Sequence, residues 1–218
     1  MVRRNGYRRP SNRRRRPYGG RDQKPRKKRQ FIKKSRNVVV LDILPHGHPQ
    51  QNKPTWKSTP IAQVLTFPDF VLYEVKMNKY NQPEVQEKDT YEQFLSDEKL
   101  KEVLKKIDYE GLTNTAKALI EPLLEKEVLN YEKRFIAFFN QSTSITPRMH
   151  ALKLLPGIGQ KHMWEILEAR KKQQFVTFQD ISDRTSISNP AKLISQRIIK
   201  ELKRDVKYYL FSKTQKYE

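Results

Sequence analysis

Residues 154–161, with the sequence LLPGIGQK, join two segments that we predict to be helical. Gly157 and Gly159 permit positive φ and let the backbone approach a ligand closely. Ile158 can fill the gap between the two helices and thereby fix their angle. The amides of this stretch would then point outward at a helix N-terminus, whose free N–H groups and partial positive charge suit a phosphate. Lys161 adds a full charge nearby, so we predict contact with a nucleic-acid backbone and not with bases.

The order apolar-Pro-Gly-apolar-Gly resembles the hairpin of the helix-hairpin-helix motif. The phosphate contacts that it predicts are Gly157, Ile158, Gly159, Gln160 and Lys161. The alternative is a tight turn between helices that binds nothing. A second predicted helix pair has TSISNP where a second hairpin would lie, and it lacks both glycines. We interpret this pair as a degenerate repeat that packs against the first and contributes little phosphate contact.

Most of the net charge lies far from this hairpin, in residues 1–36. These residues contain 17 Lys and Arg against one acid, Asp22, for a net charge of +16. The other 182 residues carry +5, from 28 basic and 23 acidic side chains, within a total of +21. Such a run repels itself and has little to bury, so we predict a tail that is disordered unless RNA orders it. Its expected contacts are Arg13, Arg14, Arg15, Arg16, Arg26, Lys27, Lys28, Arg29, Lys33 and Lys34.

The residues that follow the basic tail, 37–95, predict a small β domain. The segment 37–44 (NVVVLDIL) is short and β-branched, as in a buried strand. Strands at 61–67 and 70–77 flank Pro68-Asp69, which is a tight-turn signal. Residues 91–95 fit either a fourth strand or the start of a helix. Together these segments predict a small, partly open, OB-like barrel.

From residue 96 onward the apolar spacing is helical. Residues 96–141 are predicted to be a helical linker region, and 142–206 the helix-hairpin-helix domain. The linker would hold a helix that starts at Ser96 and carries Leu100, Val103, Leu104 and Ile107 as its apolar stripe. A second helix would be capped by Thr113 and kinked or interrupted by Pro122, and a third would span 131–140.

Two helix starts in the hairpin domain share one signal. Thr146-Pro147 and Asn189-Pro190 each place a capping side chain before a proline at the first helical position. The last segment, 207–218, begins with KYYLF, which could return to the β domain as a strand. The predicted helices of this domain are 147–154, 160–172, 178–184 and 190–204.

The loop after the first strand holds candidates for a metal or RNA site. Asp42, His46 and His48 lie close together in LDILPHGHP, and two histidines with a carboxylate can hold a metal. No other cluster completes the shell, so we favour a structural turn or an RNA-facing loop. Trp56, further along this loop between two lysines, is our candidate for stacking on a base. Phe67 and Phe70 could also stack, but we interpret them as core.

Other features limit the function classes. The absence of cysteine excludes structural disulfides, thiolate metal sites and a cysteine nucleophile. No Walker-type, dinucleotide or hydrolase glycine pattern occurs, and no catalytic constellation is recognisable. The basic N-terminus is not followed by the apolar stretch of a signal peptide, and no run is long enough to span a membrane. We therefore expect a cytoplasmic protein without a catalytic site, cofactor, metal, membrane contact or small-molecule substrate.

Several motifs in order carry a family resemblance. They are LDILPHGHP, PIAQVLTFPDFVLYEV, the helix start TNTAK at 113–117, and ITPRMHALKLLPGIGQKHMWEILEARKKQQFVTFQDIS. From about Asn37 to Phe211 the chain resembles the archaeal domain-of-unknown-function family six-fifty-five. The resemblance implies an OB/S1-like domain, a paired helix-hairpin-helix domain, nucleic-acid binding and a setting in translation. The residues that it carries over are Pro156, Gly157, Ile158, Gly159 and Lys161 in the hairpin, and Pro45, His46, Gly47 and Pro49 in the loop.

One stretch departs from the family pattern. At 88–95 the family tends to show a strand with a Gly-Lys turn, whereas this chain has KDTYEQFL. The departure puts the fourth strand, and any RNA contact on its turn, in question.

The sequence thus favours an α+β protein that binds ribosomal RNA without catalysis. It would be a constituent or an assembly factor of the archaeal ribosome, with ribosomal RNA and neighbouring ribosomal proteins as partners. The alternative is a helix-hairpin-helix protein that binds DNA in repair or chromosome maintenance, because the electrostatics would be the same. A weaker third hypothesis is an RNA-processing enzyme whose active site is not recognisable from the sequence.

Overall fold

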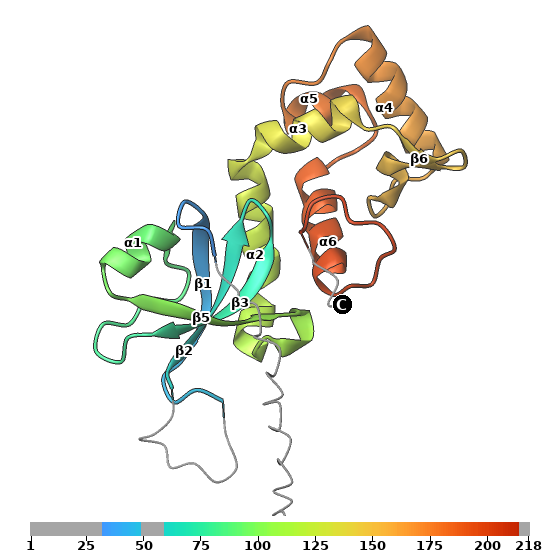
Figure 1. Ribbon diagram of the computed structural model, residues 1–218. Helices are drawn as coiled ribbons and strands as arrows, with labels where there is room; N and C mark the ends of the chain where they lie inside the picture. The colour runs from blue at the N-terminus through green and yellow to red at the C-terminus, as the bar shows by residue number, and fades with distance from the viewer. Residues whose placement is uncertain (1–31, 49–58, 214–218) are drawn as a thin grey trace, which may run out of the picture.

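Five antiparallel strands form the first half of the protein, with the order β4-β1-β2-β3-β5. The computed structural model describes residues 32–48 and 59–213 and has mixed α+β architecture (Figure 1). The three predicted strands are confirmed, and the central strand β2 is buried along its whole length. The bounds of the five strands are β1 (Asn37–Leu44), β2 (Ile61–Phe67), β3 (Val71–Met77), β4 (Lys88–Thr90) and β5 (Leu100–Ile107).

The helix predicted to start at Ser96 is wrong, because residues 100–107 form β5. This strand pairs with β3 in an irregular register, with shifts at Glu74/Val75 and Val75/Met77. Leu100 and Ile107 are buried at the two ends of β5, whereas Leu104 is 40% exposed, so the helical spacing of these residues does not describe one buried face and pairing with β3 overrides it. The boundary predicted at residue 95 therefore falls inside the sheet.

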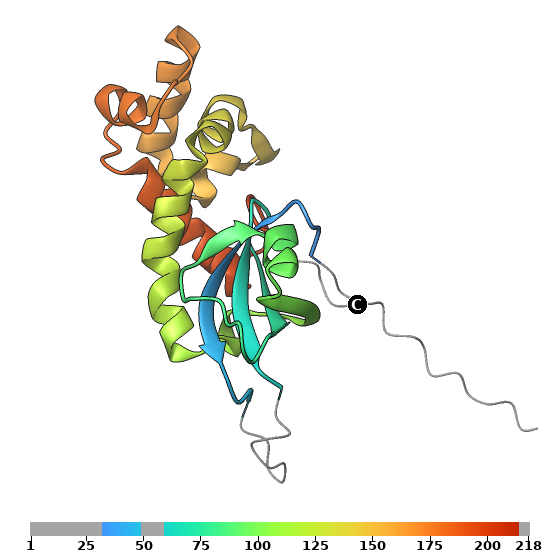
Figure 2. The ribbon, with the colours of Figure 1, turned by 90° about the vertical axis from the view of Figure 1, so that its left-hand side faces the viewer.

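The ambiguous segment at 91–95 is a helix, α1 (Tyr91–Ser96), and the strand β4 precedes it. The Thr90 hydroxyl caps α1 by accepting the amide of Gln93 at 3.1 Å. α1 packs Tyr91 and Phe94 on one face of the sheet, and α2 (Asn114–Asn130) covers the other face (Figure 2). Although residues 88–95 depart from the family pattern, residues 88–90 still form a short fourth strand, β4.

Two helices lead out of the sheet, α2 (Asn114–Asn130) and α3 (Glu132–Gln141). The Thr113 hydroxyl accepts the amide of Ala116 at 3.1 Å, which confirms the predicted cap of α2. Pro122 lies inside α2 without interrupting it. α2 therefore ends at Tyr131, which separates it from α3, and not at the proline.

Three of the four helices predicted in the hairpin domain are confirmed as α4 (Gln160–Lys172), α5 (Phe178–Arg184) and α6 (Pro190–Leu202). The fourth, at 147–154, is wrong. Its place is taken by the two-stranded ribbon β6 (Ser144–Thr146) and β7 (Met149–His150), and by the 3-10 turn η3 (Ala151–Leu154). Thr146-Pro147 lies at the bend of this ribbon, where Thr146 pairs with Met149. Its proline signal therefore marks a turn, whereas Asn189 does cap α6.

The C-terminal segment 207–211 is not a strand, but it does return to the β half. The Phe211 ring packs at 5.3 Å from Phe135 and 5.1 Å from Phe138, between ring centroids. The amide of Lys213 then donates to the carbonyl of Asp69 at 2.9 Å. A loop closed by aromatic packing thus replaces the predicted strand.

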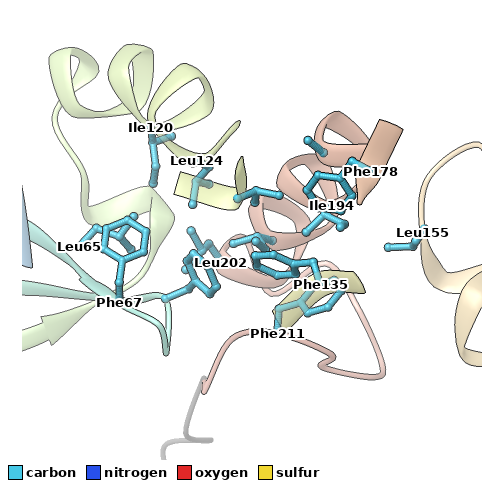
Figure 3. Packing of buried hydrophobic residues seen from close by; sticks show 14 of the residues in the cluster. Leu65, Phe67, Ile120, Leu124, Phe135, Leu155, Phe178, Ile194, Leu202 and Phe211 are labelled. Atoms are coloured by element: carbon cyan, nitrogen blue, oxygen red, sulfur yellow. The ribbon is translucent and has the colours of Figure 1, made fainter. Parts of the chain in front are cut away.

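One hydrophobic cluster runs from the sheet to the end of the helical half. It joins Leu65 and Phe67 on the sheet to Leu124 of α2, Leu202 of α6 and Leu155 beyond them (Figure 3). α2 and α6 pack directly against each other between these ends. The glycine-containing turn is therefore carried on a continuously packed body.

Candidate nucleic-acid interface

Residues 155–159, which we call the glycine turn, form a tight bend directly before α4. The amide of Ile158 donates to the carbonyl of Leu155 at 3.2 Å. Gly157 has φ of +79°, a conformation that favours glycine. The Ile158 side chain is buried in the main cluster, as the sequence predicted for an anchor between elements. Burial of the Ile158 side chain thus holds the turn in place, directly before the first residue of α4.

Gly159 is the N-cap residue of α4 and leaves the helix start open. α1, α2, α5 and α6 are each capped by a Thr or Asn side chain, whereas no side chain caps α3, whose N-cap residue is Tyr131, or α4. The first amides of a helix have no partner within it. A Cβ atom built on Gly159 would meet no atom within 4 Å, and its φ of −88° does not require glycine. The position where a Gly159 side chain would stand is therefore open, next to the uncapped start of α4.

The charged groups next to the glycine turn are Lys161 and Glu165. The Lys161 side chain is 84% exposed, and its Nζ lies 3.9 Å from Glu165 Oε1. Glu165 also accepts the hydroxyl of Ser186, and its amide at 3.1 Å. These two hydrogen bonds, with a smaller contribution from Lys161, lower the pKa of Glu165. The carboxylate is thus committed to bracing the α5–α6 loop against α4, and Lys161 remains accessible.

Polar contacts hold the two sides of the glycine turn together. His162 Nδ1 lies 3.0 Å from the carbonyl oxygen of Gly157. Lys153 Nζ donates to Gln160 Oε1 at 3.3 Å, which places a second cation beside the start of α4. The carbonyl of Leu154 accepts Arg197 Nη1 at 3.1 Å. The backbone on both sides of the turn is therefore positioned by its neighbours.

Arg197 belongs to a buried cluster that we call the α6 clasp, formed by Arg197, Glu201 and residues 208–212. Arg197 Nε lies 3.1 Å from Glu201 Oε1, and the Glu201 side chain is fully buried. Glu201 also accepts the amides of Leu210, Phe211 and Ser212 at 2.8, 3.0 and 2.8 Å. Arg197 further donates to the carbonyl of Tyr208. The clasp links the glycine turn to the C-terminal segment.

The loop between α5 and α6, which holds the TSISNP sequence, packs against α4. Ser186, in the TSISNP loop, contacts Glu165 of α4, and Ile187 is buried. A Cβ atom on Gly157 would lie 3.9 Å from Leu193 Cδ2, so α6 runs beside the glycine turn. The small phosphate contribution of this loop stays a prediction.

The two histidines of the first loop lie on the β half, away from the glycine turn in the chain. His48 Nε2 lies 2.7 Å from Glu74 Oε1, a buried carboxylate that Lys105 also approaches at 3.2 Å. His46 is exposed. Gly47 needs to be glycine, because it has φ of +64° and a Cβ atom would lie 2.6 Å from the carbonyl oxygen of Thr59. His48 thus has a structural partner on the sheet.

No metal centre forms from these residues. Within residues 32–48 and 59–213, no three His, Cys, Asp or Glu side chains come together as metal ligands would. The third member of the candidate set, Asp42, instead accepts the Thr113 hydroxyl at 2.6 Å and so supports the start of α2. In the same part of the chain, no helix has the length and apolar character to cross a membrane.

The predicted RNA contacts of the tail lie mostly outside the described residues. This applies to Arg13, Arg14, Arg15, Arg16, Arg26, Lys27, Lys28 and Arg29, as well as to Trp56 in the loop. Lys33 is exposed, and Lys34 pairs with Glu92 of α1 at 3.4 Å. The described end of the tail is anchored, because Ile32 is buried and Arg36 lies 2.7 Å from Asp69.

One exposed side chain near the glycine turn, Trp164, is not among the contacts predicted from the sequence. Trp164 lies on α4 three residues after Lys161 and is 50% exposed. The sequence could have indicated Trp164, because it lies in a predicted helix one turn after Lys161, a predicted phosphate contact.

Comparisons with known proteins agree with these motifs. Residues 34–213 match the family model described as protein of unknown function (DUF655). The chain is 40% identical over 179 residues to uncharacterized protein MJ0038 from Methanocaldococcus jannaschii, which covers 81% of this chain and 79% of the relative. The crystal structure of Af1531 from Archaeoglobus fulgidus, which carries the same family name, superposes with a TM-score of 0.71 at 38% identity. It covers 81% of this chain and 99% of the other. By matched length and identity, the chain belongs to the DUF655 family.

Proposed function

We propose that this protein binds RNA through its phosphate backbone, at the glycine turn and through its basic N-terminal residues, and that it does so without catalysis. The observation that carries the proposal is the start of α4. It has open space at Gly159, no capping side chain, and Lys161 exposed beside it. Free amides at a helix start attract anions, and a phosphate supplies the acceptors that they lack.

The proposal includes a finer architecture. The order β4-β1-β2-β3-β5 would become a barrel if β4 and β5 approached each other, so we interpret the sheet as an open, OB-like barrel. We interpret the segment from η3 to α4, with α5 and α6, as a helix-hairpin-helix pair whose first helix is reduced to a 3-10 turn. The interlocking of Glu165 with Ser186 supports this pairing.

The ribosome is the proposed location of this RNA. Residues 1–36 carry +16, whereas the rest carries +5. A basic segment of this kind contributes affinity with little orientation, and the glycine turn supplies a defined contact. That combination suits a protein seated in a large, fixed RNA. We propose ribosomal RNA and neighbouring ribosomal proteins as partners, with the protein as a constituent or an assembly factor.

Sedimentation tests the location. Lysate separated on sucrose gradients at low and high salt should show the protein with a ribosomal subunit at low salt and partly released at high salt. A protein found only at the top of both gradients would contradict the proposal. Competition between structured ribosomal RNA fragments and duplex DNA then separates RNA binding from the DNA-repair alternative.

A pair of substitutions at Gly159 tests the phosphate contact. Gly159→Asp supplies a preferred N-cap side chain, so the free energy of unfolding should be unchanged or a few tenths of a kcal/mol higher. The same carboxylate would occupy the proposed anion site and should weaken RNA binding at least about tenfold, or about 1.4 kcal/mol. The measurements are urea unfolding and filter binding.

Gly159→Asn is the matched control for Gly159→Asp, because it adds a side chain of the same shape without the charge. We expect it to cap α4 equally well and to weaken binding much less. Equal binding by the Asp variant and the wild type would mean that the glycine turn is only a turn.

A further inference from the structure

The exposed face of α4 carries an aromatic side chain that the phosphate contact does not use. Trp164 is 50% exposed, whereas its neighbours Met163 and Ile166 are buried in the main cluster. Residues three and four apart lie on one face of a helix, so Trp164 stands next to Gln160 and Lys161. One helical turn, about 5 Å along the axis, separates the indole from the start of α4.

This face is predominantly basic. Seven residues beyond Trp164, two turns along the same face, lies the exposed Lys171, and Lys172 follows it. At the other end Lys153 reaches Gln160. Glu168, one turn after Trp164, is an exposed acid on this face. A single exposed apolar side chain is ordinary on a protein surface, but one with Lys161 a turn before it and Lys171 two turns after it, on a helix beside a proposed phosphate contact, is complementary to a nucleotide.

We propose that Trp164 stacks on an unpaired base of the RNA strand whose phosphate lies at the glycine turn. The inference rests on the proposed function and adds a substrate class to it, namely single-stranded, bulged or looped RNA. In a continuous duplex both faces of each base are covered by neighbouring bases, so the indole would have no partner. In an unpaired segment a base can turn outward and lie on the ring.

Affinity measurements on two RNAs test the substrate class. The probes are a short single-stranded RNA oligonucleotide and a duplex of the same length. Trp164→Ala should weaken binding of the single strand about tenfold, within the range known for base–aromatic stacking, and leave the duplex nearly unchanged. Trp164→Phe keeps a ring and should retain most of the affinity. Tyr80→Ala, which removes a 92% exposed aromatic ring between β3 and β4, is the control and should alter neither.

Fluorescence gives a second readout that does not depend on affinity. The chain has two tryptophans, Trp56 and Trp164. In Trp56→Phe protein the emission comes from Trp164 alone, and stacking should quench it on addition of the single strand but not of the duplex. An unchanged emission at saturating single strand would overturn the inference.

The outcomes separate this inference from the proposed function. If neither RNA binds the wild-type protein, both fail together. If both RNAs bind, Gly159→Asp weakens them, and Trp164→Ala has no effect or weakens both equally, only the stacking inference fails. A selective loss on the single strand supports it.

Discussion

Removal of residues 1–31 is expected to reduce the salt dependence of RNA binding more than any other change. These residues hold 14 of the 45 Lys and Arg side chains and one acid, Asp22. Each phosphate contact that is lost lowers the slope of log affinity against log salt by about 0.7 to 0.9. If half of these cations touch phosphates, the slope should fall by several units. Filter binding across a salt series measures it.

The truncation ends at residue 31 because the residues that follow are part of the fold. Ile32 is buried in the cluster beneath α1, and Arg36 pairs with Asp69, so removal through residue 36 would also damage the fold. The matched control keeps the length of residues 1–31 and replaces their Lys and Arg by Gln. Both variants should show the same reduced slope. An unchanged slope in either one would mean that the basic residues do not touch RNA.

Glu201→Ala is expected to cost about 3 to 5 kcal/mol of the free energy of unfolding, the loss typical of breaking a buried ion pair. The Arg197 guanidinium would be left buried without its carboxylate. The amides of Leu210, Phe211 and Ser212 would lose their acceptor as well. Urea unfolding measures the loss, and hydrogen exchange at 210–212 should accelerate.

Glu121→Ala is the control for this loss, because Glu121 is an exposed glutamate on α2. It should change stability by less than about 0.5 kcal/mol. Because Arg197 also holds the carbonyl of Leu154, partly folded Glu201→Ala protein should bind RNA less well than wild type. A loss of stability below about 1 kcal/mol would show that the α6 clasp is not a main support of the fold.

The sequence predicts those elements whose signals are local. Thr113 and Asn189 cap helices as expected, because a side chain that reaches an amide three residues on needs no distant partner. β5 was missed because its apolar residues have a helical spacing, and only the pairing with β3 makes them a strand. The ribbon β6–β7 was missed because Thr146-Pro147 fits a turn as well as a helix start.

In the candidate site too, some features follow from the local sequence and others depend on the whole fold. The positive φ of Gly157 could be expected from the Pro156-Gly157 pair, which is a turn signal, and the structure agrees. The openness at Gly159 depends on what the rest of the fold leaves empty, and no sequence pattern reports that. His48 shows the opposite case, since its partner Glu74 is 26 residues away and lies on another strand. A polar loop residue that looked free in sequence is held by the fold.

Asp69 determines where the two ends of the described chain leave the fold. One carboxylate oxygen holds Arg36 at 2.7 Å and the other holds Lys213 at 2.9 Å. Neighbouring ends permit circular permutation, in which a chain is closed on itself and reopened elsewhere. Asp69, and not the direction of the chain, therefore sets the place on the surface where the basic residues 1–31 join the fold. Residues 1–31 grafted after Lys213 should leave from nearly the same place on the surface.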